Sequence, residues 1–441
     1  MSDVFYRSPG SQYPRAVRGS GIYLYDEQDR RYLDGSGGAA ISCLGHSHPK
    51  VLGAIKQQLD SLAFAHTAFF TNEPQERLAS RLAERWPGPG VRSYFLAGGS
   101  EANETAIKLA RQYWYARGQT DRHVIVSRRQ SYHGNTLGAL SASGNFKRRV
   151  PYEPLLQPWP KVSPCYAYRD QRDRESDGEY VARLAAELDQ SLTDVGSDRV
   201  AAFMAETVVG ASLGVVPPVA GYFKAIREVC DRHGILLILD EVMAGCGRTG
   251  SFFAFEKDGV VPDITTLAKG LGGGYQALAA TIVCPEIHDT LEAGGFLHGH
   301  SFVGHATACA AGLAVLETID EEDLLTKIEA RGLLLRGELR DRFRHHPNVG
   351  DVRGRGLFCG VELVRDRARK TPIPASWGLP KQIHRAAMDC GLVCYPGGSG
   401  ADGTHGAHIL LAPPFIISES EIGELCTRLE RTLGKVNLND R

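Results

Sequence analysis

Short runs of apolar residues alternate with amphipathic stretches through the middle of the chain, from about Tyr94 to Leu316. The amphipathic stretches carry apolar residues at helical spacing, as in the segment that begins at Glu101 and the one from Tyr222 to His233. This alternation predicts a parallel α/β sheet. Because the apolar runs have no polar face, we expect helices on both sides of the sheet. The predicted strands read SYFLA, HVIVS, VAAFMAE, ILLILDE, ITTLAK and LAATIV.

The two ends of the chain show a mixed pattern of helices and strands. A hairpin is predicted at 21–38 and a helix at 51–63. We expect both ends to form one smaller α+β domain beside the large domain. The predicted domain organisation is an N-terminal segment of the small domain at 1–57, the large domain at 58–314 and the rest of the small domain at 315–441. The C-terminal part contains predicted helices at 324–343, at 381–390 and from residue 420, and predicted strands in LFCGVEL and AHILLAPP.

Residues 151–178 interrupt the alternation, because they contain several Pro, Arg and Asp residues. Polar segments of this length between regular elements usually run over the surface of a protein. We therefore expect a long surface excursion here.

Composition and charge narrow the function classes. The 441 residues have a net charge of −1, so no basic surface for nucleic acid is expected. No apolar run approaches the roughly 20 residues that span a membrane, and the polar N-terminal stretch does not look like a signal peptide. The 10 cysteines are scattered without a CxxC pair, which predicts a cytoplasmic location. Without HExxH or a Cys/His quartet, no metal site is expected.

The first candidate site follows SYFLA, in the sequence GGSEANETAIKLAR. Gly98 and Gly99 let the backbone approach a ligand closely, and Ser100 is expected to be the N-cap of the following helix. The free N–H groups and the positive end of the helix dipole would then bind an anion such as phosphate. The sequence is neither a Walker A loop nor GxGxxG, and a capped helix without a ligand would show the same pattern.

Two further candidate sites lie at the ends of later strands, where the ligands of open parallel sheets collect. Asp240 and Glu241 end one strand, and a buried carboxylate there needs a partner. The partner could be structural, such as a helix N-terminus or an arginine, or functional, such as a protonated ring nitrogen or a metal. Lys269 ends the strand ITTLAK directly before a glycine cluster, and a solvated lysine at a loop mouth would fit the same pattern.

Together, these three sites fit the chemistry of pyridoxal phosphate. The cofactor needs a phosphate cradle, a lysine that forms a Schiff base with its aldehyde, and an acid that keeps its pyridine nitrogen protonated. Tyr132 follows the strand HVIVS and is placed to lay its ring on the cofactor, although a core or surface tyrosine would also fit.

These residues lie in motifs that resemble those of class III (ω-type) aminotransferases of the fold-type-I pyridoxal-phosphate family. Seven motifs occur in the family's order between Leu44 and Ala311, and the hairpin and LLAPPFII extend the resemblance over nearly the whole chain. The motifs are LGHSHP, GGSEANETAIKLAR, SYHGNTLGALSASG, AETVVGASLGVVPP, LILDEVMAGCGRTGSFFAFE, PDITTLAKGLGGGYQALAA and HGHSFVGHATACAA.

The resemblance implies a role for each matching residue. Lys269 would hold the cofactor and shuttle a proton, and Asp240 would pair with the pyridine nitrogen. Val242 and Tyr132 would pack on opposite faces of the ring. Ser301, where the family usually has Thr, would reach the phosphate of the neighbouring subunit, which implies a homodimer, or a dimer of dimers, with shared active sites. The other residues implied in cofactor binding are Gly99, Ser100, His133, Gly134 and Glu206.

Some positions depart from the family pattern. Met243 stands where Gln is common, and Phe302 and Ala306 stand where Tyr and Pro are common. Many relatives supply a carboxylate-binding arginine from the loop before APP, but residues 395–414 contain neither Arg nor Lys. His405 and His408 are the only candidate cations in that loop.

We therefore expect an amino group to move from an ω-amine or ω-amino acid to a small α-keto acid such as pyruvate, by a ping-pong mechanism. The keto-acid carboxylate would be bound by backbone N–H groups, by His405 or by an arginine from elsewhere in the chain. Alternatives are an aminotransferase that uses 2-oxoglutarate, a decarboxylating transaminase and an aminomutase. A non-catalytic phosphate-binding protein is also possible, but it would not need Lys269.

Overall fold

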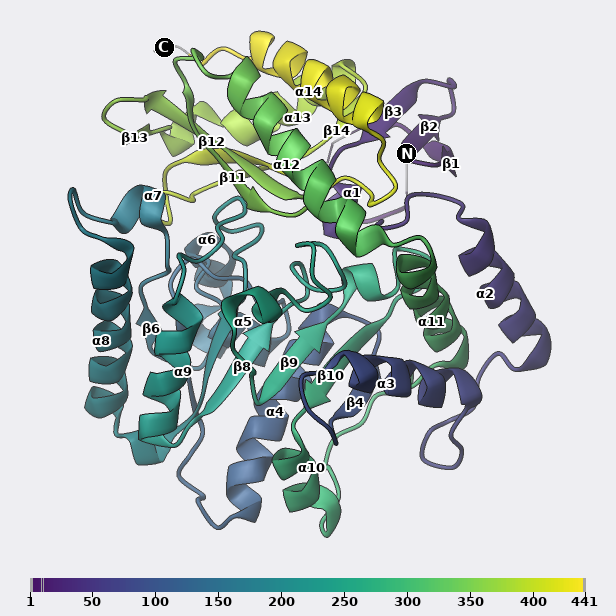
Figure 1. Ribbon diagram of the computed structural model, residues 1–441, viewed down its shortest axis with the longest axis vertical. Coiled ribbons are helices and arrows are strands. Elements are labelled where there is room, and N and C mark those ends of the chain that lie inside the picture. The colour runs from purple at the N-terminus through teal and green to yellow at the C-terminus, as the bar shows by residue number, and fades with distance from the viewer. Residues whose placement is uncertain (1–2, 9, 11, 439–441) are drawn as a thin grey trace.

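The computed structural model describes residues 3–8, 10 and 12–438. Its centre is a seven-stranded sheet in the order β4-β10-β9-β8-β7-β5-β6 (Figure 1). The strands from β9 to β6 run parallel, and β10 is antiparallel to both of its neighbours. The predicted mostly parallel sheet is confirmed, with LAATIV (β10) reversed. The strands are β4 Arg92–Leu96, β5 Val124–Arg128, β6 Lys161–Val162, β7 Val200–Glu206, β8 Leu236–Asp240, β9 Ile264–Leu267 and β10 Ala279–Val283.

Helices cover both faces of this sheet, as the wholly apolar strands predict. Along β8, Leu237 and Leu239 belong to one apolar cluster, whereas Leu236 and Ile238 belong to another on the opposite face. The helices of this region are α3 Glu73–Arg85, α4 Gly99–Ala116, α5 Leu137–Ala142, α6 Phe146–Arg149, α7 Ala167–Asp170, α8 Asp177–Val195, α9 Tyr222–His233, α10 Pro285–Glu292 and α11 Ala306–Glu321.

The two ends of the chain meet in a second region above the central sheet (Figure 1, purple, light green and yellow). The short strand β14 pairs in parallel with β3 of the predicted hairpin, so the C-terminal part completes an N-terminal sheet. A second sheet, antiparallel throughout, has the order β11-β12-β16-β15, with β13 beside β12. The strands are β1 Ala16–Ser20, β2 Tyr23–Asp26, β3 Arg31–Asp34, β11 Val349–Arg355, β12 Phe358–Asp366, β13 Thr371–Pro372, β14 Leu392–Val393, β15 Tyr395–Gly398 and β16 Ala407–Leu411, and the helices are α1 Gly37–Ala40, α2 Pro49–Ser61, α12 Leu324–Arg342, α13 Leu379–Asp389 and α14 Glu419–Gly434.

Helix α11 joins the two regions. Ala314 and Val315 belong to the apolar core of the upper region, whereas Cys309 and Leu316 belong to a core cluster on one face of the central sheet. The predicted boundary at residue 314 therefore falls inside one continuous helix. The domain limits stay a prediction.

The segment 151–178 is more than a surface excursion, so that prediction is wrong in part. It contributes the edge strand β6, and Tyr166 is fully buried. The Tyr166 hydroxyl donates to Glu362 on β12, and the same buried carboxylate pairs with Arg169 and Arg353. A buried carboxylate needs such partners, and here they tie the segment to the upper region.

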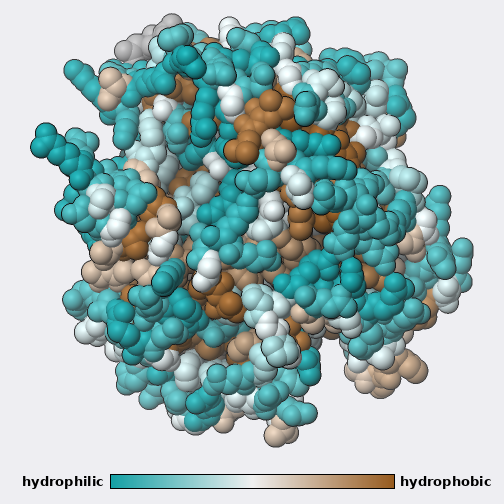
Figure 2. Space-filling view, viewed as in Figure 1, coloured by the Kyte–Doolittle hydropathy of each residue, from teal (hydrophilic) through white to brown (hydrophobic). Residues whose placement is uncertain are grey.

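The visible surface is mostly hydrophilic, with small hydrophobic patches between polar groups (Figure 2). Among the described helices, none combines the length and apolar composition needed to cross a bilayer. All ten cysteines are free thiols.

The close approach of Gly332 to Gly356 allows the packing of α12 to be tested by thermal unfolding. A Cβ at Gly332 would lie 2.1 Å from the carbonyl oxygen of Gly356, whereas a Cβ at Gly337 of the same helix would meet nothing within 4 Å. Replacing glycine by alanine inside a helix favours folding by about 1 kcal/mol, but overpacking costs roughly 1–3 kcal/mol. We expect Gly332→Ala to lower the thermal unfolding midpoint and Gly337→Ala to keep or raise it. Equal midpoints for the two variants would contradict this packing.

Candidate active site

The register of the central sheet aligns three polar side chains at its carboxyl edge. Glu206 on β7 lies beside Asp240 on β8, and Asp240 lies beside Thr266 on β9. Lys269 follows β9 three residues after Thr266. This edge opens into a cavity of about 1110 Å³, which is lined by every predicted site residue except Ser301. The cavity-lining predicted residues are Gly99, Ser100, Tyr132, His133, Gly134, Glu206, Asp240, Val242 and Lys269.

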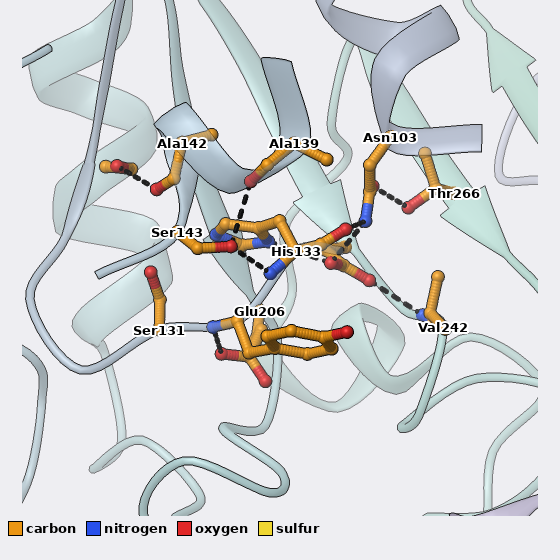
Figure 3. A network of polar contacts seen from close by, with 12 residues as sticks. Asn103, Ser131, His133, Ala139, Ala142, Ser143, Glu206, Val242 and Thr266 are labelled. Carbon is orange, nitrogen blue, oxygen red and sulfur yellow. Dashed lines mark hydrogen bonds and ion pairs between the residues drawn. The ribbon is translucent and has the colours of Figure 1, made fainter. Parts of the chain in front are cut away.

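A buried polar network surrounds Asp240, and its members Asn103, His133, Val242 and Thr266 are labelled in Figure 3. The Oδ1 of the aspartate accepts a hydrogen bond from the Val242 backbone N–H at 2.9 Å, and its Oδ2 lies 2.8 Å from Asn103 Nδ2 and 2.8 Å from His133 Nδ1. Asn103 is held in turn, since its Oδ1 accepts from the Thr266 hydroxyl at 2.7 Å. Backbone and side chains from four parts of the chain thus position one carboxylate at the cavity wall.

The two other acids at this edge differ in function. Glu241 turns away from the cavity and accepts hydrogen bonds from the Ala254 and Phe255 N–H groups and the Thr207 hydroxyl. It is fully buried, and burial raises its pKa to about 8. Glu241 therefore takes the structural role of capping a helical turn. Glu206 lines the cavity, accepts from the Tyr132 and Gly210 N–H groups, and has its pKa raised by burial.

Lys269 has two properties that suit a reactive amine. Its φ of 48° places a non-glycine residue in the left-handed region, which typically costs about 1–3 kcal/mol and is found mostly at functional sites. Burial lowers the pKa of its ammonium to about 8, against the opposing attraction of Asp240 and Glu206. About a tenth of the amine is therefore uncharged at pH 7.

The predicted anion site lies at the start of α4, where the helix cap differs from the prediction. The N-cap is Gly98, in an extended conformation, and not Ser100. The helix begins earlier because Glu101 accepts the Ala97 N–H at 3.0 Å, which stabilises the turn before Ser100. No side chain caps the helix, so the first N–H groups of α4 remain open to a ligand. Gly134 approaches closely, since a Cβ there would lie 2.6 Å from Ser100 Oγ.

The structure separates three other predicted residues from the cavity lining. Ser301 lies on an exposed loop outside the cavity of its own chain. His405 is half-buried and pairs with Asp402 at 2.8 Å. His408 is buried, and burial lowers its pKa to about 4, so it is neutral at pH 7. Neither histidine lines the cavity, so of the groups expected to bind a keto-acid carboxylate the structure favours backbone N–H groups or an arginine from elsewhere in the chain.

The lining residues that were not found from the sequence include Asn103, Tyr395 and Arg148. Asn103 carries a signal that could have revealed it, because it is a polar residue within the otherwise apolar buried face of α4. Arg148 carries no such signal in the sequence, since it follows Lys147 and precedes Arg149 in a basic run.

The cavity residues fit pyridoxal phosphate. The open N–H groups of α4 suit a phosphate, the Asp240 carboxylate suits a protonated pyridine nitrogen, and the Lys269 amine suits an aldehyde. Tyr132 and Val242 line the same cavity and supply an aromatic and an aliphatic surface for a flat ring.

Comparison with known proteins agrees with pyridoxal phosphate as the cofactor. Residues 7–433 match the family described as Aminotransferase class-III. An uncharacterized aminotransferase of Schizosaccharomyces pombe is 43% identical, over 98% of this chain and 94% of the relative. A thermostable (S)-enantioselective omega-transaminase from Thermomicrobium roseum superposes with a TM-score of 0.90 at 38% identity, covering 97% of this chain and 96% of that one. An amine transaminase from an uncultivated Pseudomonas species, solved in its PLP-bound form, gives 0.90 at 34% identity, covering 98% and 99%.

The fold and the cavity together define a fold-type-I pyridoxal-phosphate transaminase. The chain belongs to the class III aminotransferase family.

The lowered pKa of Lys269 leads to a pH test on the cofactor-free protein. An uncharged amine is needed to attack the aldehyde, and a pKa of about 8 leaves about a tenth of Lys269 uncharged at pH 7. We expect the rate at which added pyridoxal phosphate develops its protein-bound visible band to rise with pH and level off above about 8.5. A rise that continues towards pH 10.5 would contradict this assignment.

The matched control is Lys161, whose pKa burial lowers to about 7. It donates to the carbonyls of Ser141 and Trp159 and lies outside the cavity lining. The band should be lost in Lys269→Ala and kept in Lys161→Gln.

Proposed function

We propose that this enzyme transfers an amino group from an ω-amine or ω-amino acid to a small α-keto acid such as pyruvate, by a ping-pong mechanism. The observation that carries the proposal is one cavity lined by Lys269, Asp240 and the start of α4, in a chain of the class III family. Because residues 395–414 supply no arginine or lysine, a keto-acid carboxylate in this cavity would be bound by groups from elsewhere in the chain.

In this proposal, each residue acts at a stated place on the cofactor. The N–H groups of Gly99 and Ser100 with the Ser100 hydroxyl hold the phosphate, and His133 and Gly134 complete the wall. Asp240 holds a proton on the pyridine nitrogen, and Glu206 supports that network. Tyr132 and Val242 pack against the two opposite faces of the cofactor ring.

Pyridoxal phosphate supplies an aldehyde and an electron-withdrawing ring that stabilises negative charge on the carbon from which a proton is removed. Lys269 provides the amine that holds the cofactor and, when displaced by substrate, takes and returns that proton. Its lowered pKa suits this role, since a general base acts best with a pKa near the working pH.

We also propose a cytoplasmic homodimer in which Ser301 binds the phosphate of the partner's site. Ser301 lies on an exposed loop next to Phe302, whose ring packs 6.1 Å from that of Phe64. Exposed apolar residues gather on this loop and on the segment after α2, as expected of an interface. They are Leu62, Phe64, Phe69, Phe70, Leu297 and Phe302.

A half-reaction screen tests the substrate proposal. The holoenzyme is mixed with a panel of amines and ω-amino acids while its visible band is followed, and pyruvate or 2-oxoglutarate is then added. We expect ω-amino donors to bleach the band and pyruvate to restore it faster than 2-oxoglutarate. A strong preference for 2-oxoglutarate would overturn the choice of acceptor, and no bleaching with any amine would overturn the transaminase proposal.

Dilution tests the shared site. Sedimentation velocity and cofactor absorbance measured on the same dilution series should show dimers that release pyridoxal phosphate as they dissociate. Ser301→Ala should lose cofactor at higher protein concentration than the wild type. A monomer that keeps its cofactor and activity would contradict this assembly.

A further inference from the structure

The charged side chains of the cavity are unevenly distributed. Its two acids, Glu206 and Asp240, lie at the sheet edge and are engaged by protein donors. The lining also carries Lys147 and Arg148 from α6 and Arg7 from the N-terminal segment. An anionic group on a substrate would therefore meet repulsion at the sheet edge and attraction at the α6 wall.

Two adjacent arginines on α6 differ in their contacts. The Arg149 guanidinium donates to the carbonyls of Leu140, Ser141 and Ser143 at the end of α5 and pairs with Glu153. Within the described part of the chain, no carboxylate lies within ion-pair distance of the Arg148 guanidinium. Arg149 is thus a structural residue, whereas Arg148 keeps its hydrogen-bond donors available.

Arg148 is also held in place. Its guanidinium lies 4.6 Å from the centre of the Tyr132 ring, in a cation–π contact. The short helix that carries it begins with Asn145, whose side chain caps the Arg148 N–H. A guanidinium stacked by its face still presents the N–H groups along its edge, which is the geometry that binds a carboxylate through two parallel hydrogen bonds.

The position of Arg148 relates it to the reacting amine. Arg148 and Lys269 line the same cavity, and the positive charge of Arg148 adds to the lowering of the Lys269 pKa. The cavity is also lined by apolar side chains from the part of the chain around α6. These are Leu137, Leu140, Pro151 and Leu155.

We propose that Arg148 binds the carboxylate of the substrate, and that the preferred donor is an amine joined to a carboxylate by an apolar spacer. The inference rests on the transaminase function proposed above and makes Arg148 its specificity-determining residue. The guanidinium fork of Arg148 matches the two oxygens of one carboxylate. The spacer lies along the apolar wall, with the amine towards Lys269 and the carboxylate towards α6.

The test compares two donors that differ only in the carboxylate, 5-aminopentanoate and pentylamine. In Arg148→Gln, the ratio of their kcat/KM values should fall by about 10- to 100-fold, mainly through a higher KM for 5-aminopentanoate, because a charged hydrogen-bonded pair is lost. Arg148→Lys should restore part of the ratio. If Arg148 only steadied the Tyr132 ring, both donors would lose activity equally, and that result would overturn the proposal.

A binding measurement separates this inference from the proposed function. Pentanoate has neither amine nor carbonyl, so calorimetry on the holoenzyme measures carboxylate binding without turnover. We expect weaker binding by Arg148→Gln and unchanged binding by Arg232→Gln, since Arg232 pairs with Asp189 at the surface. Loss of binding only in Arg148→Gln supports the inference even if no donor reacts. Failure of the wild type to bind pentanoate, or equal binding by all three proteins, would overturn it.

Discussion

Asp240 carries a carboxylate that is only 4% exposed, and burying such a group is costly unless its oxygens are hydrogen-bonded. The network around it requires β7, β8 and β9 in register, α4 against the sheet to bring Asn103, and the turn after β5 to bring His133. The same arrangement brings the open end of α4 and Lys269 to one cavity. The hydrogen bonds that this buried carboxylate needs thus bring together the same elements that form the site.

Much of the fold could be predicted from local pattern, because helices and strands reflect the spacing of apolar residues. Helix α9 has the predicted limits, Tyr222–His233. The reversed direction of β10 could not be predicted, since the apolar pattern of a strand does not show whether it runs parallel or antiparallel to its neighbours. The sequence predicts Ser100 as the N-cap of α4, but the helix begins at an earlier residue. Glu101 accepts the Ala97 backbone N–H, and the preference for Ser at an N-cap does not take this contact into account.

The candidate site also contains some residues that the sequence predicts and others that only the fold reveals. Residues at strand ends, such as Asp240 and Lys269, could be predicted because the carboxyl ends of parallel strands meet at one edge. Arg148 could not, because only the fold assigns Arg149 to the carbonyls of α5 and leaves its neighbour free. The two histidines of the 395–414 loop are candidates by their chemistry alone. In the fold His408 is buried with a lowered pKa, His405 pairs with Asp402, and neither lines the cavity.

The central claim is that Asp240 keeps a proton on the ring nitrogen of the cofactor. The most direct test is to reconstitute the protein with pyridoxal phosphate labelled with ¹⁵N in the ring and to measure the nitrogen chemical shift. The wild type should show a protonated nitrogen at neutral pH, and Asp240→Asn, which keeps the shape but removes the charge, should show an unprotonated one. An unprotonated nitrogen in the wild type, or the same protonated state in both proteins, would contradict the claim.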